Sequence, residues 1–512
     1  MRAMITTSTS TYDEVPYESY PIIGTHPDRL STLARLMGIE TPALGTCRVL
    51  ELGCAGGGNL VPMALELPGA QFTGVDLSAA QIAGGNALVQ ALRLDNVRLI
   101  AADVMDIGDD FGRFDYVIAH GLYSWVPNAT QDKILQICKR HMAPNGVAYV
   151  GYNTLPGWRV RGTVRDLMRY QALQFPETDR RLAQARGILD FVARGVPDEN
   201  NAYGKLLRSE LDHLRNAPDY YVLHEYLTDI NEPLYFYEFV ERAYAHGLQY
   251  LGDAEFASML ALRFAPQVAD TIRATPDVIR QEQMMDFLSN RAFRQTLLMH
   301  LDQPVDRGIT GQRLQGLWVA SGAAAARANP NLAEGVPEKF CTPAGPCVTT
   351  PRAITKAALL VLAARWPLAV AFQELLAAAY SRLNPLAGKP PQAEDAELLG
   401  RELLQCYAGA VLELHACPSP FSIDPGARPL ASSLARLQAE RGAHVSTLHH
   451  ESIVVPDAIR ALLPLLDGTR TVEDISAAIR AMGSGAPGKP VEPAAVKSAI
   501  DQIARNALIT RT

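Results

Sequence analysis

The sequence has no surplus of basic charge. Its 512 residues include 47 Lys and Arg against 54 Asp and Glu, which gives a formal net charge of −7 at pH 7. Proteins that hold nucleic acid through its phosphates show the opposite balance. We therefore expect no nucleic-acid partner.

Long apolar runs are missing as well. The longest stretch, Ala357–Phe372, is interrupted by Arg365 and Pro367, whereas a membrane-spanning helix needs about 20 apolar residues. The N-terminal stretch Met1–Thr11 is polar and small, without the basic start and apolar core of a signal peptide. We expect no membrane insertion and a cytoplasmic location.

Cysteine is sparse and irregularly spaced. The seven cysteines stand at positions 47, 54, 138, 341, 347, 406 and 417. An odd number without a repeated spacing indicates reduced thiols and a cytosolic setting. Cys341 and Cys347 flank a turn rich in Pro and Gly, but too few other ligands lie nearby to complete a metal set. No metal site is expected.

One glycine-rich stretch organises the first part of the chain. Val49 and Leu50 lead into Glu51, the turn 53–58 follows, and an apolar periodic run extends from Leu60 through Leu67. This order is typical of a strand, a tight turn and a helix, the opening unit of a doubly wound α/β domain. The turn falls at the carboxyl end of the strand, where such sheets bind their ligands.

The spacing of this turn distinguishes between ligands. A dinucleotide site prefers G-x-G-x-x-G, with the pyrophosphate at the helix N-terminus. Here Glu51 precedes Gly53 by two positions, which is the pattern of an S-adenosylmethionine site, E/D-x-G-x-G-x-G. A single glycine-rich turn is weak evidence, so the interpretation depends on the strands that follow.

Three more predicted strands follow, Gln71–Ser78, Val97–Val104 and Phe114–His120. The first ends near Asp76, placed to accept hydrogen bonds from both ribose hydroxyls, and the next near Asp103, placed to hold an adenine amino group. An acid at the ligand end of three of the four strands favours S-adenosylmethionine. The predicted cofactor-binding residues are Glu51, Gly53, Cys54, Ala55, Gly57, Asn59, Asp76, Leu77, Asp103, Val104 and His120.

Aromatic residues follow the fourth strand, where the donor methyl group would lie. Tyr123 and Trp125 are able to form a π-rich wall that holds an ammonium or packs an alkyl stem. The alternative is a core aromatic cluster that closes the loop. No general base is obvious, because His120 serves equally well to hold the cofactor.

The fifth predicted strand, Val147–Asn153, brings Tyr152 and Asn153 to the same edge. Tyr17 and Tyr20 belong to an N-terminal segment before a helix that starts near Thr25. They either line the methyl-transfer cavity or only pack this lid onto the domain. The candidate catalytic residues are Tyr17, His120, Tyr123, Trp125 and Asn153, with Tyr152 lining the same pocket.

Longer motifs add a family resemblance. They are Leu50–Ala55, Ile118–Gly121 with Tyr123–Pro127, Tyr152–Thr154 with Pro156–Trp158, and the blocks Tyr220–Leu251 and Asp286–Leu298. These motifs resemble bacterial class I methyltransferases that carry a methyltransferase regulatory domain, and the resemblance covers nearly the whole chain. It implies methylation of protein lysines, as in enzymes acting on outer-membrane proteins. Ala55 replaces a glycine of the broader pattern, so the turn needs an allowed dihedral there.

Four segments are predicted: a methyltransferase domain with its lid at 1–160, a helical regulatory, cap or dimerisation domain at 161–302, a linker with a first winged-helix-like module at 303–425, and a second such module at 426–512. Residues 160–300 are expected to be helical and 303–350 to be linker and loop. His224 and Glu225 either contact substrate or pack, and for His224 packing is favoured.

The two C-terminal modules are each predicted from three helices and a terminal β element. The last unit, from Glu451, has seven acidic and seven basic residues. A DNA-reading module shows a basic recognition helix, whereas Val472–Ile475 begins with acids. Both modules are therefore interpreted as protein-interaction or structural units.

The sequence therefore predicts an S-adenosylmethionine-dependent methyltransferase that acts on lysines of an unfolded or extended protein, with an envelope protein as the candidate substrate and a homodimer as one option for its assembly. One alternative is an O- or N-methyltransferase of a peptide natural product or small molecule. A carboxylate acceptor needs no deprotonation, so it would suit the absence of a base. A second alternative is a non-catalytic sensor of S-adenosylmethionine.

Overall fold

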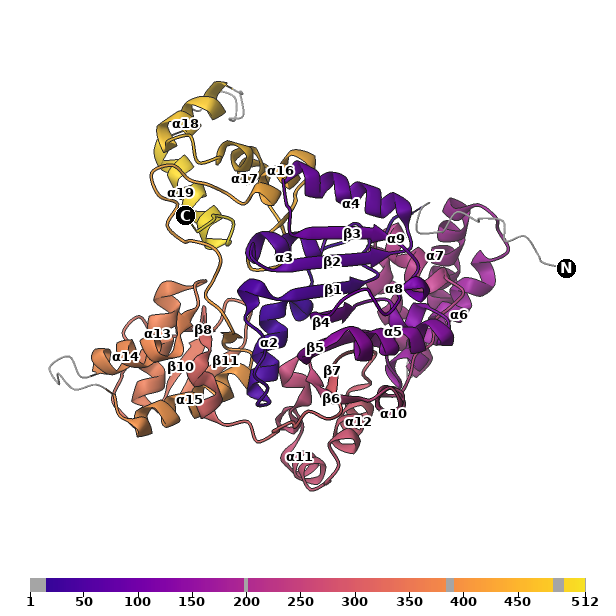
Figure 1. The fold of residues 1–512 in the computed structure, drawn as a ribbon, viewed down its shortest axis with the longest axis horizontal. Coiled ribbons are helices and arrows are strands. Elements are labelled where there is room, and N and C mark those ends of the chain that lie inside the picture. Colours follow the sequence, from indigo (N-terminus) through magenta and orange to yellow (C-terminus); the bar gives the residue numbers. More distant parts are fainter. Residues whose placement is uncertain (1–14, 198–200, 384–390, 482–491, 512) are drawn as a thin grey trace.

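The computed structural model describes residues 15–197, 201–383, 391–481 and 492–511. The first residues of the N-terminal segment predicted as the lid lie outside the described residues. A central sheet carries helices on both faces, and two smaller modules lie to one side of it (Figure 1).

The sheet has seven strands in the order β3-β2-β1-β4-β5-β7-β6. Strands β1 to β5 are parallel, and β7 runs antiparallel to its neighbours β5 and β6. This confirms the predicted α/β class and the five predicted strands. The strand bounds are β1 (Arg48–Leu52), β2 (Gln71–Asp76), β3 (Val97–Ala101), β4 (Phe114–Ala119), β5 (Met142–Asn153), β6 (Leu248–Asp253) and β7 (Phe293–His300).

Alternation along the strands builds two cores, one on each face of the sheet. In β1, Val49 belongs to one buried cluster, whereas Leu50 and Leu52 belong to the other. Tyr116 and Val117 of β4 divide in the same way. Successive side chains of a strand point to opposite faces, so a central strand buried on both faces is apolar throughout. The flanking helices are α2 (Pro27–Leu36), α3 (Leu60–Glu66), α4 (Ala79–Ala91) and α5 (Asn128–His141).

A helical insertion separates β5 from β6 and lies beside the sheet (Figure 1). Its first helices form a core of their own, against which Val15 of the N-terminal segment packs. The bounds are α6 (Gly157–Ala172), α7 (Thr178–Gly195), α8 (Ala202–Arg215), α9 (Asp219–Tyr221), the π-helix Val222–Leu227 and α10 (Phe236–Ala245). This part of the segment 160–300 is helical, as expected.

The expectation that residues 160–300 are helical throughout is wrong in two places. Residues Leu248–Asp253 and Phe293–His300 are the sixth and seventh strands of the main sheet, on either side of α11 (Pro266–Arg273) and α12 (Val278–Ser289). The sheet is thus built by residues from both sides of the predicted boundary at 160. Strand β7 pairs with β5 across the whole insertion, a long-range pairing that local periodicity cannot reveal.

The segment 303–350 is not the simple linker that was expected. It contains β8 (Trp318–Ala320), β9 (Ala324–Ala325) and a hairpin of β10 (Glu338–Cys341) and β11 (Cys347–Thr350). β8 lies between β12 (Val370–Ala371) and β13 (Glu413–His415) in a small sheet. The predicted helices follow as α13 (Ala353–Arg365), α14 (Phe372–Leu383) and α15 (Ala393–Ala408).

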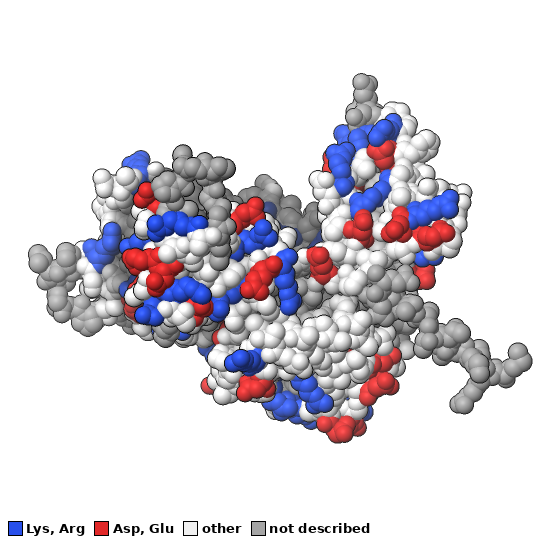
Figure 2. All heavy atoms as spheres, turned by 90° about the horizontal axis from the view of Figure 1, so that it is seen from above, with Lys and Arg blue, Asp and Glu red and all other residues white. Residues whose placement is uncertain are grey.

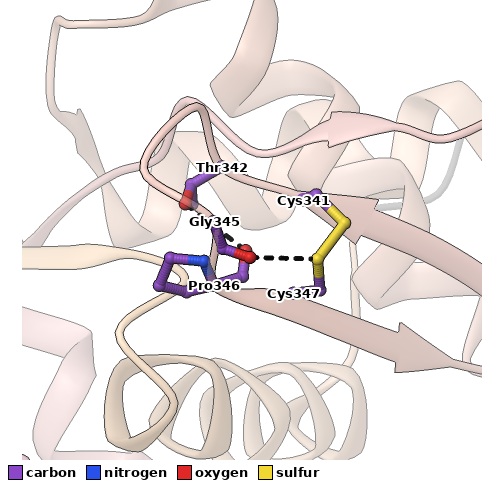
Figure 3. The surroundings of a disulfide bond; sticks show 5 residues. All are labelled: Cys341, Thr342, Gly345, Pro346 and Cys347. Atoms are coloured by element: carbon purple, nitrogen blue, oxygen red, sulfur yellow. Dashed lines mark hydrogen bonds between the residues drawn. A yellow bond between two sulfur atoms is a disulfide. The ribbon is translucent and has the colours of Figure 1, made fainter.

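Cys341 and Cys347 form a disulfide across this hairpin (Figure 3). The two residues are direct partners in the antiparallel register, with their Cα atoms 4.1 Å apart. This corrects the expectation that all seven cysteines are reduced thiols, because the sequence spacing did not reveal that the hairpin brings these two face to face. The other five cysteines are free.

The last module has a separate core of its own. Its elements are α16 (Ser433–Arg441), β14 (His444–Ser446), β15 (Ser452–Val454), α17 (Asp457–Leu462), α18 (Val472–Ala481) and α19 (Pro493–Arg505). The chain end returns to the start of the module, where Ile509 bridges Ala431. In Figure 1 this module and the one before it lie on the side of the sheet away from α6 and α7.

Within the described residues, no helix combines the length and apolarity needed to cross a membrane. Figure 2 shows acidic and basic side chains interspersed over one face of the molecule, with no large area of a single sign on that face.

A buried ionic cluster fixes the inserted strand β7. Arg294 is fully buried and donates to Asp286, at 2.8 and 2.9 Å, and to Glu282 at 2.9 Å. Its guanidinium lies 3.7 Å from the centre of the Phe236 ring, and Asp253 of β6 is 3.6 Å away. Arg294 therefore pairs with carboxylates from α12 and β6, and Arg291 is a second cation, 2.9 Å from Asp253. Burial lowers the pKa of Arg294, but the α12 carboxylates Glu282 and Asp286 raise it well above its ordinary value.

We expect Arg294→Met to destabilise the protein by about 3–5 kcal/mol, because it removes the cation that is hydrogen-bonded to the buried Glu282 and Asp286. The matched control is Arg273→Met, which removes a half-exposed pair with Asp270 and should change stability by less than about 0.5 kcal/mol. Denaturant unfolding followed by tryptophan fluorescence measures both. Equal stabilities of the two variants would contradict this account of the cluster.

Candidate functional site

The glycine-rich turn after β1 uses backbone conformations that favour glycine. Gly53 and Gly57 have φ values of 73° and 75°, and Ala55 between them has 49°. The left-handed region is open but narrow for a residue with a Cβ atom, and Ala55 occupies it. The N–H groups of Gly53 and Cys54 both donate to Val75, so β2 holds the start of the turn.

These contacts limit how the predicted turn residues can meet a ligand. Gly57 N–H donates to Cys54, and Ala55 N–H donates to Asp76. The Cys54 side chain is buried in the core. The N–H groups of the turn residues Gly53, Cys54, Ala55 and Gly57 thus already donate within the protein. What the turn offers to a ligand is close approach to its backbone.

Asp76 stands at the end of β2, half-buried, beside the turn. Its Oδ2 accepts from Ala55 N–H at 2.8 Å and its Oδ1 from Ser78 N–H at 2.9 Å. These two contacts fix the Asp76 carboxylate at the carboxyl end of β2, beside the glycine-rich turn. Leu77 next to it is 68 % exposed, an apolar surface of the kind that an adenine ring covers.

Asp103 follows β3, the neighbour of β2. It is exposed, and its Oδ1 accepts from Met105 N–H at 2.9 Å, which starts the short helical turn Val104–Asp106. Val104 is buried and Met105 is 43 % exposed. The predicted acids and the apolar residues after β2 and β3 thus lie along one edge of the sheet.

Glu51 is a buried acid with an incomplete set of hydrogen bonds. It is 3 % exposed, and burial, reinforced by the charge of Asp76, raises its pKa to about 7. Oε1 accepts from Asn59 at 2.8 Å, whereas Oε2 has no hydrogen-bond partner in the part of the chain that the structure describes. A buried acceptor without a donor is costly, so this oxygen is suited to receive a ligand donor.

Asn59 holds Glu51 in place and does not itself face a ligand. Its amide group donates to Glu51 Oε1 and Thr25 Oγ1 and accepts from Ile22 N–H and from His450 Nε2, at 2.8 to 2.9 Å. All four hydrogen-bonding positions are therefore used within the protein. This corrects the prediction that Asn59 binds the cofactor directly.

His450 is a contributor that the sequence did not reveal. It lies in the loop between β14 and β15, is 2 % exposed, and contacts both Asn59 and Glu66. A residue of the last module thus contacts Asn59, the residue that holds Glu51 in place. No local signal pointed to this residue, because its partners lie nearly 400 positions earlier in the chain.

His120 leaves β4 beside the turn. Its Nδ1 is 2.7 Å from the Tyr149 hydroxyl, and its ring packs against Phe293 of β7. Burial lowers the pKa of His120 to about 4, so the imidazole is neutral at physiological pH. Leu122, two residues on, packs directly over Gly53, which brings the loop after β4 to the glycine-rich turn.

Tyr123 and Tyr152 do not line an open pocket. Both are at most 1 % exposed and belong to the core on one face of the sheet. Phe239 stacks on Tyr152 with ring centres 4.1 Å apart and packs edge-on against Tyr123. The structure therefore favours the core cluster over the π-rich wall for these two residues, and it corrects the assignment of Tyr123 as catalytic.

Trp125 and Asn153 keep their place at the strand edge. Trp125 is half-buried and packs edge-on against Trp158 at 5.9 Å. The Asn153 amide donates to Asn231 Oδ1 at 2.9 Å, and its backbone N–H donates to Ser124 Oγ. The loops after β4 and β5 and the helical insertion therefore converge on this point.

The N-terminal segment crosses the turn and reaches the helical insertion. Ser19 lies so close to Gly58 that a side chain at Gly58 would collide with its backbone. Tyr17 packs against Tyr220 and His224, with ring centres 5.0 and 5.9 Å apart. His224 is buried and bonds to Val15 O at 2.7 Å, which supports the packing interpretation for it.

The arrangement suits S-adenosylmethionine. A buried acceptor at Glu51, a half-buried acid at Asp76, an apolar surface at Leu77 and a second acid at Asp103 follow in order along the carboxyl edge of the sheet. The glycine-rich turn offers close approach without a phosphate-binding set of free amides. When bound, S-adenosylmethionine supplies an activated methyl group on a sulfonium.

Three family models match the chain. The model described as "Methyltransferase domain" matches residues 50–148, "Predicted methyltransferase regulatory domain" matches 218–300, and "PKMT, C-terminal winged helix domain" matches 427–486. The regulatory match spans β6 and β7, so that family unit includes two strands of the sheet.

Two relatives come from Rickettsia prowazekii. The uncharacterized protein RP789 is 44 % identical over 304 residues, covering 59 % of this chain and 55 % of its own length. The uncharacterized protein RP028 is 39 % identical over 237 residues, covering 46 % of this chain and 95 % of its own length. The match therefore spans about half of the first relative and nearly all of the second.

A solved structure matches almost end to end. PKMT2 from Rickettsia typhi, in complex with AdoHcy, aligns with a TM-score of 0.85 at 30 % identity over 96 % of this chain and 100 % of that one. AdoHcy is S-adenosylmethionine without its methyl group. The chain belongs to the class I S-adenosylmethionine-dependent methyltransferases that carry a methyltransferase regulatory domain and a PKMT-type winged helix, and S-adenosylmethionine is its cofactor.

Proposed function

We propose that this protein transfers a methyl group from S-adenosylmethionine to lysine side chains of an extended protein segment, of the outer-membrane-protein type. The observation that carries the proposal is the match to PKMT2 over 96 % of the chain, which includes the insertion, both C-terminal modules and the cofactor edge. A likeness limited to the catalytic domain would say nothing about the acceptor.

Lysine must lose its proton before it attacks, and its ordinary pKa of about 10.4 opposes this. Removal from water lowers that pKa. The N-terminal segment, the loops after β4 and β5, and the helical insertion surround the strand edge with aromatic side chains, among them Tyr17, Trp125 and Phe293. This environment excludes water from an acceptor and favours its neutral form.

Neutral His120 and the Asn153 amide are the two polar groups that we consider for handling the acceptor lysine. With a pKa of about 4, His120 is a weak base, so it serves to orient neighbours through Tyr149 rather than to take the lysine proton. Asn153, fixed by Asn231, is placed to orient the acceptor amine. The attacking nitrogen forms the new N–CH3 bond, the S–CH3 bond breaks, and the remaining proton leaves to solvent.

Labelled S-adenosylmethionine tests this function with unfolded envelope proteins, a peptide extract and a metabolite extract as acceptors. Asp76→Ala should lower cofactor affinity by about 100-fold, since hydrogen bonds to a charged group contribute about 1.5–3 kcal/mol each, and label in protein lysines should disappear. Asp95→Ala is the matched control, because Asp95 is exposed before β3, at the opposite edge of the sheet.

Label confined to small molecules would overturn the lysine assignment. Cofactor binding without label in any fraction would overturn catalysis on these acceptors and favour a sensor. Identical activity of Asp76→Ala and Asp95→Ala would show that the cofactor does not use Asp76.

The buried Glu51 should make the folded protein less stable at alkaline pH, where its carboxyl group is ionised. In the unfolded chain Glu51 ionises near its ordinary pKa, whereas in the fold it keeps its proton up to about pH 7. The folded state binds more protons in this window, so stability falls as pH rises through it and stays reduced above it.

We therefore expect Glu51→Gln to be more stable than the wild type by about 2–3 kcal/mol at pH 8 and nearly equal to it at pH 5. The same variant should bind S-adenosylmethionine at least about tenfold more weakly, because it loses a charged acceptor. Denaturant unfolding at both pH values and calorimetric titration measure these effects. Glu241→Gln, at an exposed position of α10, is the control, and equal behaviour of both variants at pH 8 would contradict the argument.

A further inference from the structure

A second cluster of titratable side chains lies away from the cofactor edge. Glu413 and His415 stand two positions apart on β13, so both point to one face of the strand. His449, from the loop after β14, meets them there. His449 Nε2 lies 2.9 Å and His415 Nε2 lies 3.5 Å from Glu413 Oε2, and the three ligand atoms are all within 4.8 Å of one another.

The hydrogen bonds around His415 define its tautomer. Its Nδ1 lies 2.7 Å from Asp28 Oδ2, and an N–H there donates to this carboxylate. Asp28 is itself fixed by Ala416 N–H. Burial lowers the pKa of His415, but Asp28 and Glu413 together raise it to about 10, so a metal ion binds at Nε2 by displacing the proton there. Nε2 is buried and has no hydrogen-bond partner in the described chain. A carboxylate behind a histidine is the usual support of a metal-binding imidazole.

The spacing of the three atoms fits a small divalent cation. Ligand atoms bound to zinc at about 2.0–2.1 Å in a tetrahedral arrangement lie about 3.4 Å from each other. The two distances to Glu413 Oε2, 2.9 and 3.5 Å, bracket that value. Two His and one carboxylate are a common donor set for zinc and for non-haem iron.

The cluster opens on one side to a cavity of about 520 Å³, which His26, Glu66 and Tyr407 also line. The cavity leaves room for water or another group as a further ligand. His415 and Glu413 are only partly covered, with 20 % and 39 % of their side chains exposed. The site is therefore accessible to an ion from solvent.

A neighbouring trio, His26, Glu66 and His450, is less suited to a metal. His26 Nδ1 accepts from Asp28 N–H at 3.1 Å, so the proton of the neutral ring lies on Nε2, the atom that faces Glu66. His450 Nε2 faces Asn59 Oδ1. All three residues of this trio are buried, whereas Glu413, His415 and His449 are half-buried and more open to an incoming ion.

We propose that Glu413, His415 and His449 form a binding site for a divalent transition-metal ion of the zinc type, with Asp28 supporting His415. This replaces the expectation that the chain has no metal site. The ion joins β13 of the first module to the loop of the last module and, through Asp28, to α2 of the catalytic domain. It acts as a clamp that holds the three parts of the chain together.

Tag-free protein tests the site with zinc chloride and cobalt chloride, independently of methyl transfer. The wild type should retain one zinc ion per chain after gel filtration, measured by elemental analysis, and cobalt should give the visible absorption of a low-coordinate site. Glu413→Gln and His449→Gln should each weaken zinc binding by more than about 100-fold, and Asp28→Asn by about 10–100-fold. His444→Gln changes an exposed histidine of the same module and should bind zinc normally.

Circular dichroism checks that each variant is folded, and the wild-type cobalt spectrum does not depend on any variant. No retained zinc and no cobalt spectrum in the wild type would overturn the proposal. So would zinc binding that survives Glu413→Gln with unchanged affinity. Loss of binding in Glu66→Gln together with normal binding in Glu413→Gln would place the ion at the buried trio and overturn the site proposed here.

Discussion

The hydrogen bond from Asn59 to the buried carboxylate of Glu51 joins the cofactor edge to the rest of the molecule. Glu51 needs a donor because it is buried, and Asn59 supplies one while its remaining amide positions bind the N-terminal segment, the start of α2 and His450. A single fully satisfied amide therefore connects the first strand, the lid and the last module. A change in any of these parts acts on Glu51, the acid predicted to meet the cofactor.

The acids predicted to bind the cofactor and the partners of Tyr17 and Asn153 come from different parts of the chain. The parallel strands present the acids Glu51, Asp76 and Asp103, whereas the helical insertion between β5 and β6 supplies the partners of Tyr17 and Asn153. The insertion returns to the sheet as β6 and β7, where the buried Arg294 holds it. The position of the insertion over the edge is thus determined by the sheet itself.

The last module contributes two adjacent histidines with different tasks. His450 supports Asn59, while His449 faces Glu413 and His415 in the proposed metal site. The loop between β14 and β15 therefore contacts both Asn59, which holds Glu51, and Glu413 of the proposed metal site. This module is therefore built into the contacts of the chain rather than attached to it as an independent unit.

The sequence by itself determined the five parallel strands, the glycine-rich turn, the acids Glu51, Asp76 and Asp103, and most helices, because these depend on local spacing and periodicity. It did not determine which side chains face the ligand. Tyr123 follows β4 and Tyr152 lies near the end of β5, where a pocket wall would stand, yet Phe239 covers both. Asn59 lies in the turn, yet neighbours from distant parts of the chain use its whole amide. The strands β6 and β7, the pairing of Cys341 with Cys347 and the approach of His450 were decided only by tertiary structure, because each depends on which surfaces meet after the chain has folded.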